Sequence, residues 1–159
     1  GHNIDPAIIE EALSDHPDVA EVAAVGRPDA RAGELPVVYA TARRGARPDP
    51  EALVEQAAAR IAERPARPHA VRVVDALPVT AVGKIFKPEL RRREAEMVCR
   101  EWLEADGQTG WTLCAELTEA GIEVHVQITS RDRVEAVERT LAPLTGSFML
   151  RVDSGDLPS

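Results

Sequence analysis

Aromatic side chains are scarce in this sequence, since two Trp, two Phe and one Tyr make up 3% of its 159 residues. A hydrophobic core must therefore be built from aliphatic side chains, which dominate the 44% hydrophobic fraction. No apolar run reaches the roughly 20 residues of a membrane-spanning helix, and the first residues lack the order of a signal peptide. Two cysteines cannot form a disulfide scaffold, so we expect a reducing, cytoplasmic location.

Cations are outnumbered as well: 19 basic residues face 27 acidic ones, a net charge of −8. Nucleic-acid binding and attachment to an anionic membrane both need an excess of cations, so we expect neither partner. The four histidines are scattered and none pairs with a cysteine at metal-ligand spacing, so we expect no structural zinc site. Almost every cation is Arg, and the two lysines are Lys84 and Lys87. Because Arg cannot always replace the compact ammonium of Lys in catalysis, these two positions become candidates.

The charge is divided unevenly along the chain. Residues 1–94 hold 15 acids and 14 bases, whereas residues 95–159 hold 12 acids and 5 bases. This shift predicts two domains, 1–94 and 95–159, the second consisting of a linker helix and a small extension of unknown role.

Hydrophobic periodicity in the first part predicts a helix from Pro6 to the residues before Pro17, and a second helix over 50–61. It also predicts strands over 19–25, 35–41 and 71–74, with a connecting loop over 26–33. The expected fold is therefore α+β, a small mixed sheet flanked by helices.

In the second part, a long helix is expected from Pro88 to about Leu103. Residues 111–120 fit two patterns, and we favour a helix over the alternating strand that they also allow. Strands over 122–128 and 148–152 predict a small α/β or βαβ extension, with a helix between them that opens at Ser130 and Asp132 and has Leu141 on its apolar face.

The segment over 77–88 is a loop that carries both lysines. Pro78 stiffens its entry, and Gly83 permits a sharp turn directly before Lys84. A lone Gly-Lys pair is a weak signal, and the segment lacks the spaced glycine and the following Ser or Thr of a phosphate-binding P-loop.

Three segments, however, carry a specific resemblance. Residues 77–91 read LPVTAVGKIFKPELR, residues 25–29 read VGRPD followed by Gly33-Glu34, and residues 1–10 read GHNIDPAIIE. In this order they resemble the C-terminal domain of the adenylate-forming acyl-CoA synthetases, the AMP-binding enzyme superfamily. The resemblance covers residues 1–93, so the rest of the chain is expected to be an extra C-terminal extension.

The resemblance implies a lid domain that serves a two-step reaction with ATP and CoA as substrates. A carboxylic acid, expected to be a fatty acid, forms an acyl-adenylate and is then transferred to the CoA thiol. Lys84 matches the catalytic lysine, with Thr80 and Gly83 supporting its loop. Gly1, His2 and Asn3 match the segment along the CoA arm.

The same resemblance implies that the large adenylation domain works in cis, that it lies outside this chain, and that it holds the Mg²⁺. The fragment alone is therefore expected to be inactive. Two alternatives stay open: an adenylation domain that loads a carrier-protein pantetheine, and a tail with a regulatory role or one that forms a homo-oligomer. Arg60 and the run Arg91–Arg93 are weaker candidates for contact with CoA, since charged residues on a helix more often form ion pairs or face solvent.

Overall fold

The computed structural model describes residues 5–155, which form two compact units. The first comprises residues 5–27 and 35–90, and the second comprises residues 28–34 and 91–155. Both contain a three-stranded sheet flanked by helices, which confirms the expected α+β class. The domain boundary expected between residues 94 and 95 falls inside one helix and stays a prediction.

The first unit contains, in sequence order, α1 (Pro6–Ser14), most of β1 (Val19–Asp29), most of β2 (Gly33–Ala42), α2 (Pro50–Arg60) and β3 (Ala70–Val74), with a 3₁₀ turn at Arg64–Ala66. Both helices begin with the same N-terminal capping pattern. Asp5 accepts a hydrogen bond from Ala7 N at 2.9 Å and Asp49 accepts one from Glu51 N at 3.2 Å, each with a proline at the next position. An Asp cap and a proline at the first position satisfy or remove free N–H groups.

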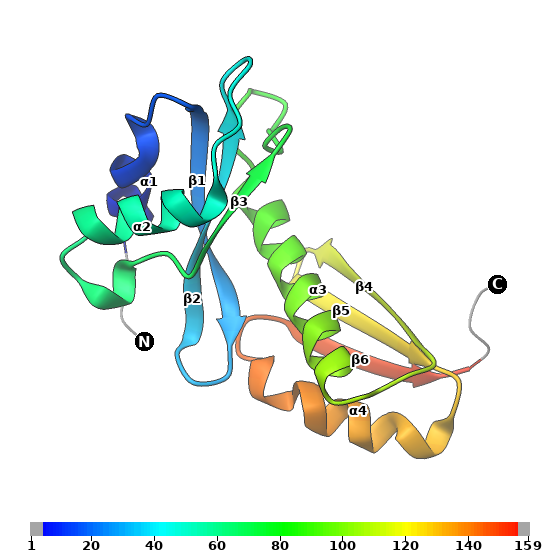
Figure 1. The fold of residues 1–159 in the computed structure, drawn as a ribbon. Helices are drawn as coiled ribbons and strands as arrows, with labels where there is room; N and C mark the ends of the chain where they lie inside the picture. Colours follow the sequence, from blue (N-terminus) through cyan, green and yellow to red (C-terminus); the bar gives the residue numbers. More distant parts are fainter. Residues whose placement is uncertain (1–4, 156–159) are drawn as a thin grey trace. The chain divides into compact units, whose positions relative to one another are not determined.

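The sheet of the first unit has the order β1-β2-β3, and β2 and β3 run parallel with Val37 opposite Ala70. Alternation along the strands gives it two buried faces. One face, with Val38 and Ala40, packs against α1 and α2 (Figure 1). The opposite face, with Val37 and Tyr39, packs against residues of the segment over 77–90. The lysine-bearing loop is therefore built onto the sheet.

The second unit contains the larger part of α3 (Lys87–Ala105), then β4 (Trp111–Thr118), β5 (Gly121–Ile128), α4 (Val134–Leu141) and β6 (Met149–Ser154), with 3₁₀ turns at Arg131–Arg133 and Ala142–Leu144. Its sheet has the order β4-β5-β6; β4 and β5 are antiparallel, and β5 and β6 are parallel. The β5-α4-β6 connection is the expected βαβ unit. Helices α3 and α4 cover one face of this sheet with an aliphatic core that includes Cys99, Leu103 and Leu141, and Trp102 and Trp111 pack against its margin (Figure 1).

Residues 111–120 are not the helix that we favoured. Residues Trp111–Thr118 form strand β4, and the reason is visible in burial. Leu113 is buried, but Leu117 is 37% exposed, so the residues that would share one helical face do not share the core. Alternate side chains, Leu113 and Ala115, enter the core instead. The alternating pattern is therefore the correct one.

The loop expected over 26–33 is also wrong, because β1 continues through Asp29 and β2 begins at Gly33. Pro28 lies in β1, which is an edge strand, where a missing N–H need not break the ladder. The turn is shorter than expected because Asp29 Oδ1 accepts hydrogen bonds from Arg31 N and Ala32 N at 2.9 and 2.8 Å. Such side-chain bonding is typical of a tight turn that Asp stabilises.

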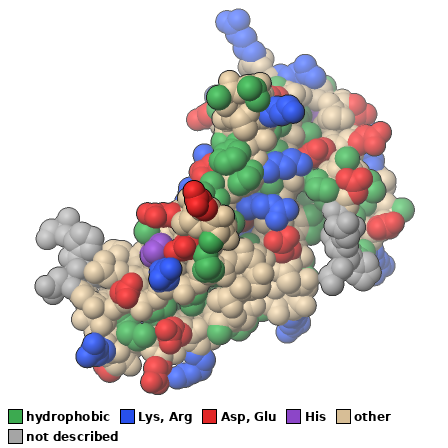
Figure 2. Space-filling model, turned by 180° about the vertical axis from the view of Figure 1, so that it is seen from behind, with side chains coloured by type: hydrophobic (Ala, Val, Ile, Leu, Met, Phe, Trp, Pro, Cys, Tyr) green, Lys and Arg blue, Asp and Glu red, His purple; other side chains and the backbone are tan. Residues whose placement is uncertain are grey.

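Among the described residues, no helix is both long enough and apolar enough to cross a membrane. Figure 2 shows basic and acidic side chains interspersed over the face that it displays, rather than gathered by sign. Cys99 is buried, whereas Cys114 is exposed.

Candidate active site

Residues 78–86 form a small hairpin rather than an irregular loop. Val79 and Ile85 are bridged in antiparallel fashion, and Phe86 N donates to Pro78 O at 2.7 Å. Closer to the tip, Thr80 N donates to Lys84 O at 2.7 Å. This backbone pairing fixes the conformation of the segment that carries Lys84.

The tip of this hairpin depends on Thr80 and Gly83. Gly83 N donates to Thr80 O at 2.9 Å, and Lys84 N lies 3.2 Å from Thr80 Oγ1. Gly83 has φ +79, in the left-handed region that closes a three-residue hairpin loop. Glycine enters this region without the Cβ penalty of other residues. The expected loop-supporting residues are thus brought together, although their role in catalysis stays a prediction.

The base of the hairpin is anchored while its tip is free. Leu77 is 7% exposed and packs, together with Ile85, in the cluster of Val37, Tyr39 and Leu90. At the tip, Val82 is 81% exposed and Lys84 is exposed as well. The fold therefore holds an ammonium group away from its own core.

The two lysines differ in their surroundings. Lys87 Nζ lies 2.7 Å from Glu10 Oε1, and the same oxygen accepts a hydrogen bond from Ala24 N at 2.8 Å. Lys87 therefore ties the start of α3 to α1 and β1. No carboxylate among residues 5–155 forms an ion pair with Lys84. The role of Glu10 could not be predicted from the sequence, because nothing in linear spacing links it to Lys87.

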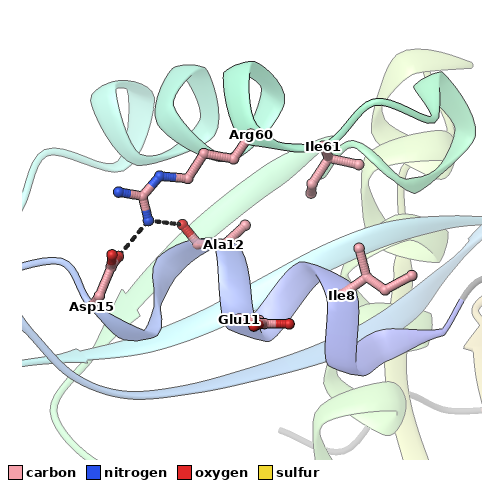
Figure 3. A pocket seen from close by; sticks show the side chains of 6 residues that line it. All are labelled: Ile8, Glu11, Ala12, Asp15, Arg60 and Ile61. Atoms are coloured by element: carbon pink, nitrogen blue, oxygen red, sulfur yellow. Dashed lines mark hydrogen bonds and ion pairs between the residues drawn. The ribbon is translucent and has the colours of Figure 1, made fainter.

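The Arg60 side chain already has binding partners within the chain. Figure 3 shows its guanidinium reaching from α2 to α1, where Nη1 donates to Ala12 O at 3.0 Å and to Asp15 Oδ1. The bond from Arg60 is the largest influence that lowers the pKa of Asp15 below its usual range. A hollow of about 340 Å³ lies beside this contact. The cation at its rim already holds the C-terminal end of α1, so its expected contact with CoA stays a prediction.

The arginine run at 91–93 also has partners within the chain. Arg91 lies 3.7 Å from Glu34, and Arg92 lies 2.7 Å from Glu96. Arg92 also donates to Ala115 O at 2.9 Å. Arg93 has interactions of its own within the chain. These contacts support the plainer interpretation of the run, as a set of ion-pair partners.

Two further expectations concern ligands. Gly1, His2 and Asn3, expected along the CoA arm, lie outside the described residues. Within residues 5–155 no group of three or more His, Cys, Asp or Glu side chains is placed to hold a metal ion. Mg²⁺ therefore has no assigned ligand in the described part of this chain.

Comparison with known proteins identifies the segment that bears this hairpin. Residues 8–84 match the AMP-binding enzyme C-terminal domain family. Marinolic acid–CoA ligase of Pseudoalteromonas sp. (strain SANK 73390) is 45% identical over 105 residues, which are 66% of this chain and 16% of that protein. Acetyl-coenzyme A synthetase of Deinococcus radiodurans is 44% identical over 95 residues, 60% of this chain and 14% of that protein.

Solved structures agree with this assignment. ATP-bound MatB from Rhodopseudomonas palustris superposes with a TM-score of 0.57 at 28% identity, covering 61% of this chain and 19% of that one. Residues 8–84 thus belong to the AMP-binding enzyme C-terminal domain family, as the three sequence motifs predict. The chain spans less than a fifth of the length of these relatives.

Proposed function

We propose that this chain is the C-terminal lid of an acid–CoA ligase and that Lys84 is its catalytic cation. The hairpin carries this proposal: from a firmly anchored base it presents an exposed ammonium that pairs with no carboxylate among residues 5–155, within a segment of the matching family. The relatives are named as CoA ligases or synthetases acting on different acids. A fatty acid is our proposed substrate class, with ATP and CoA as the other two substrates.

The chemistry explains why a mobile cation is useful. In the first step a carboxylate oxygen attacks the α-phosphorus of ATP, and the bond to the pyrophosphate oxygen breaks. Negative charge from the carboxylate and the triphosphate converges on the reacting centre. An ammonium held within hydrogen-bond distance stabilises that charge more in the transition state than in the separated reactants.

The second step has no need for the same cation. The sulfur of CoA attacks the acyl carbon, the bond to the AMP oxygen breaks, and the thiol proton leaves to solvent or to a base. An exposed hairpin tip that is held only at its base can withdraw without disturbing the core beneath it. We therefore assign Lys84 to adenylate formation alone.

The test uses the longer protein that includes the large adenylation domain. Lys84→Ala should slow adenylate formation, measured by pyrophosphate exchange, by roughly 10²–10³-fold, the cost of losing one preorganised electrostatic donor. Thioester formation from a pre-made acyl-adenylate should stay within about threefold of wild type. Equal loss in both half-reactions would contradict the assignment.

Lys87→Ala is the matched control, because it removes the same group three residues further along. This substitution breaks the ion pair with Glu10, so it should lower the free energy of unfolding by no more than about 1 kcal/mol. The rate of pyrophosphate exchange should be preserved. Replacing CoA by a phosphopantetheinylated carrier protein separates the two acceptor classes. If a thioester forms on the carrier protein and none forms on CoA, the carrier-loading alternative is correct and the CoA proposal is wrong.

A further inference from the structure

The two edges of the β4-β5-β6 sheet are treated differently by the fold. At the β4 edge, side chains of α3 bind the outward-facing backbone. Arg92 Nη1 donates to Ala115 O at 2.9 Å, and Glu96 Oε2 accepts from Ala115 N at 3.3 Å. Arg100 Nη2 donates to Leu113 O at 3.3 Å. This edge is closed to a further strand, a common protection against edge-to-edge association.

Among residues 5–155, no side chain binds the outer backbone of β6 in the way that Arg92 and Glu96 bind that of β4. β6 is the last strand of its sheet, and no other strand of residues 5–155 pairs with its outer side. Gly155 N donates to Ile128 O at 3.1 Å, and Ser154 is the register partner of Ile128. In a parallel pair, residues alternate between facing the neighbouring strand and facing away. Leu150, Val152 and Ser154 therefore direct their N–H and C=O groups toward the open edge.

We propose that this open edge pairs with β6 of a second copy of the chain, antiparallel and about a two-fold axis at Val152. In that register Val152 faces Val152 of the other copy, and Leu150 faces Ser154. These are the residues whose backbone groups are available, so each facing pair can exchange two hydrogen bonds. The two sheets would then form one continuous six-stranded sheet. This inference does not depend on the proposed ligase activity.

The charged residues of β6 favour a second copy of the chain as the partner at this open edge. Arg151 and Asp153 both lie exposed on the face of the sheet opposite the core. The register about Val152 places Arg151 directly opposite Asp153 of the other copy, twice by symmetry. These are non-hydrogen-bonded positions, where cross-strand side chains come closest. Centring the axis on either charged residue would set that residue against itself, so the strand complements its own sequence in this register.

Arg151 is already held in a suitable place. Its Nε lies 2.9 Å from Glu123 Oε2 on the neighbouring strand, and the Glu123 side chain is 13% exposed. This contact keeps the guanidinium on the outer face before association. A six-residue strand pair covers much less than the roughly 1,200–2,000 Å² of a standard interface, so the dimer should be weak and depend on concentration.

Sedimentation velocity of the full 159-residue chain over a range of concentrations tests the proposal. A monomer–dimer equilibrium is expected, and Asp153→Lys should raise its dissociation constant at least about tenfold, because both cross-strand pairs become repulsive. Glu119→Lys is the matched control: it makes the same charge change at an exposed position in the turn between β4 and β5, and should leave the constant within about twofold. Circular dichroism checks that both variants are folded.

Amide hydrogen exchange locates the contact. The Val152 and Ser154 amides should exchange freely when the chain is dilute and gain protection as the dimer forms. A chain that stays monomeric at its highest soluble concentration would overturn the proposal. So would a dimer that Asp153→Lys does not weaken, or protection of these amides that is already present in the monomer, which would mean that the chain covers its own edge.

Discussion

Gly83→Ala is the substitution that most directly probes the lysine hairpin. The backbone at Gly83 has φ +79, and a Cβ built there meets no atom within 4 Å. The cost of alanine is therefore conformational rather than steric crowding, about 1–2 kcal/mol for an L-residue in the left-handed region. We expect the hairpin tip to rearrange, which would move the Lys84 backbone that is paired to Thr80.

Gly45→Ala separates this local effect from general destabilisation. Gly45 lies in the same unit, has φ +82, and also has nothing within 4 Å of its Cβ position. Chemical denaturation should therefore show similar losses of about 1–2 kcal/mol for the two variants. Gly83→Asn should cost less than Gly83→Ala, because Asn tolerates this backbone region better.

Activity then distinguishes the two glycines. In the longer protein, pyrophosphate exchange should fall for Gly83→Ala well beyond the fall for Gly45→Ala, while thioester formation from acyl-adenylate should not. If Gly83→Ala were as stable as wild type, the left-handed turn would be refuted. If it were destabilised but exchanged pyrophosphate normally, the hairpin geometry would have no part in placing the cation.

Local signals were sufficient for most of the first unit. Asp5-Pro6 and Asp49-Pro50 mark helix starts through bonds made within two residues, so they can be read without tertiary information. Strand β3 is short, but its aliphatic run lies between turn residues. The hairpin itself was expected only as a loop, because the antiparallel bridge between Val79 and Ile85 depends on the sheet beneath them.

Strand β4 shows why the second unit was harder to predict. Leu113, Leu117 and Ala120 have helical spacing, whereas Leu113 and Ala115 also fit alternation. The choice between them is made by partners elsewhere in the chain: β5 on one side and the side chains of α3 on the other. Short apolar runs are ambiguous in this way whenever tertiary pairing decides between helix and strand. The open edge of β6 was likewise unpredictable, since it depends on strand order.

Two remaining predictions concern the thiols and the α1–α2 contact. In the native chain a thiol reagent should label exposed Cys114 rapidly and buried Cys99 only on unfolding; equal native rates would contradict the packing of α3. Asp15 has its pKa held below the ordinary 3.8, chiefly by the hydrogen bond from Arg60. A carboxyl whose pKa is lower in the folded state stabilises that state above its unfolded pKa and loses this contribution as the pH falls through the folded value. Wild type should therefore be more stable than Asp15→Asn at neutral pH, by a small margin because the pair is exposed, and the difference should shrink below about pH 3.8. Urea denaturation of both proteins at pH 7 and pH 3 measures this, with Arg60→Gln and the double variant completing a thermodynamic cycle. The ion pair would be shown not to hold the two helices together by either of two results. The stability difference between wild type and Asp15→Asn could be the same at pH 3 as at pH 7, or Asp15→Asn could cost as much in the Arg60→Gln background as in wild type.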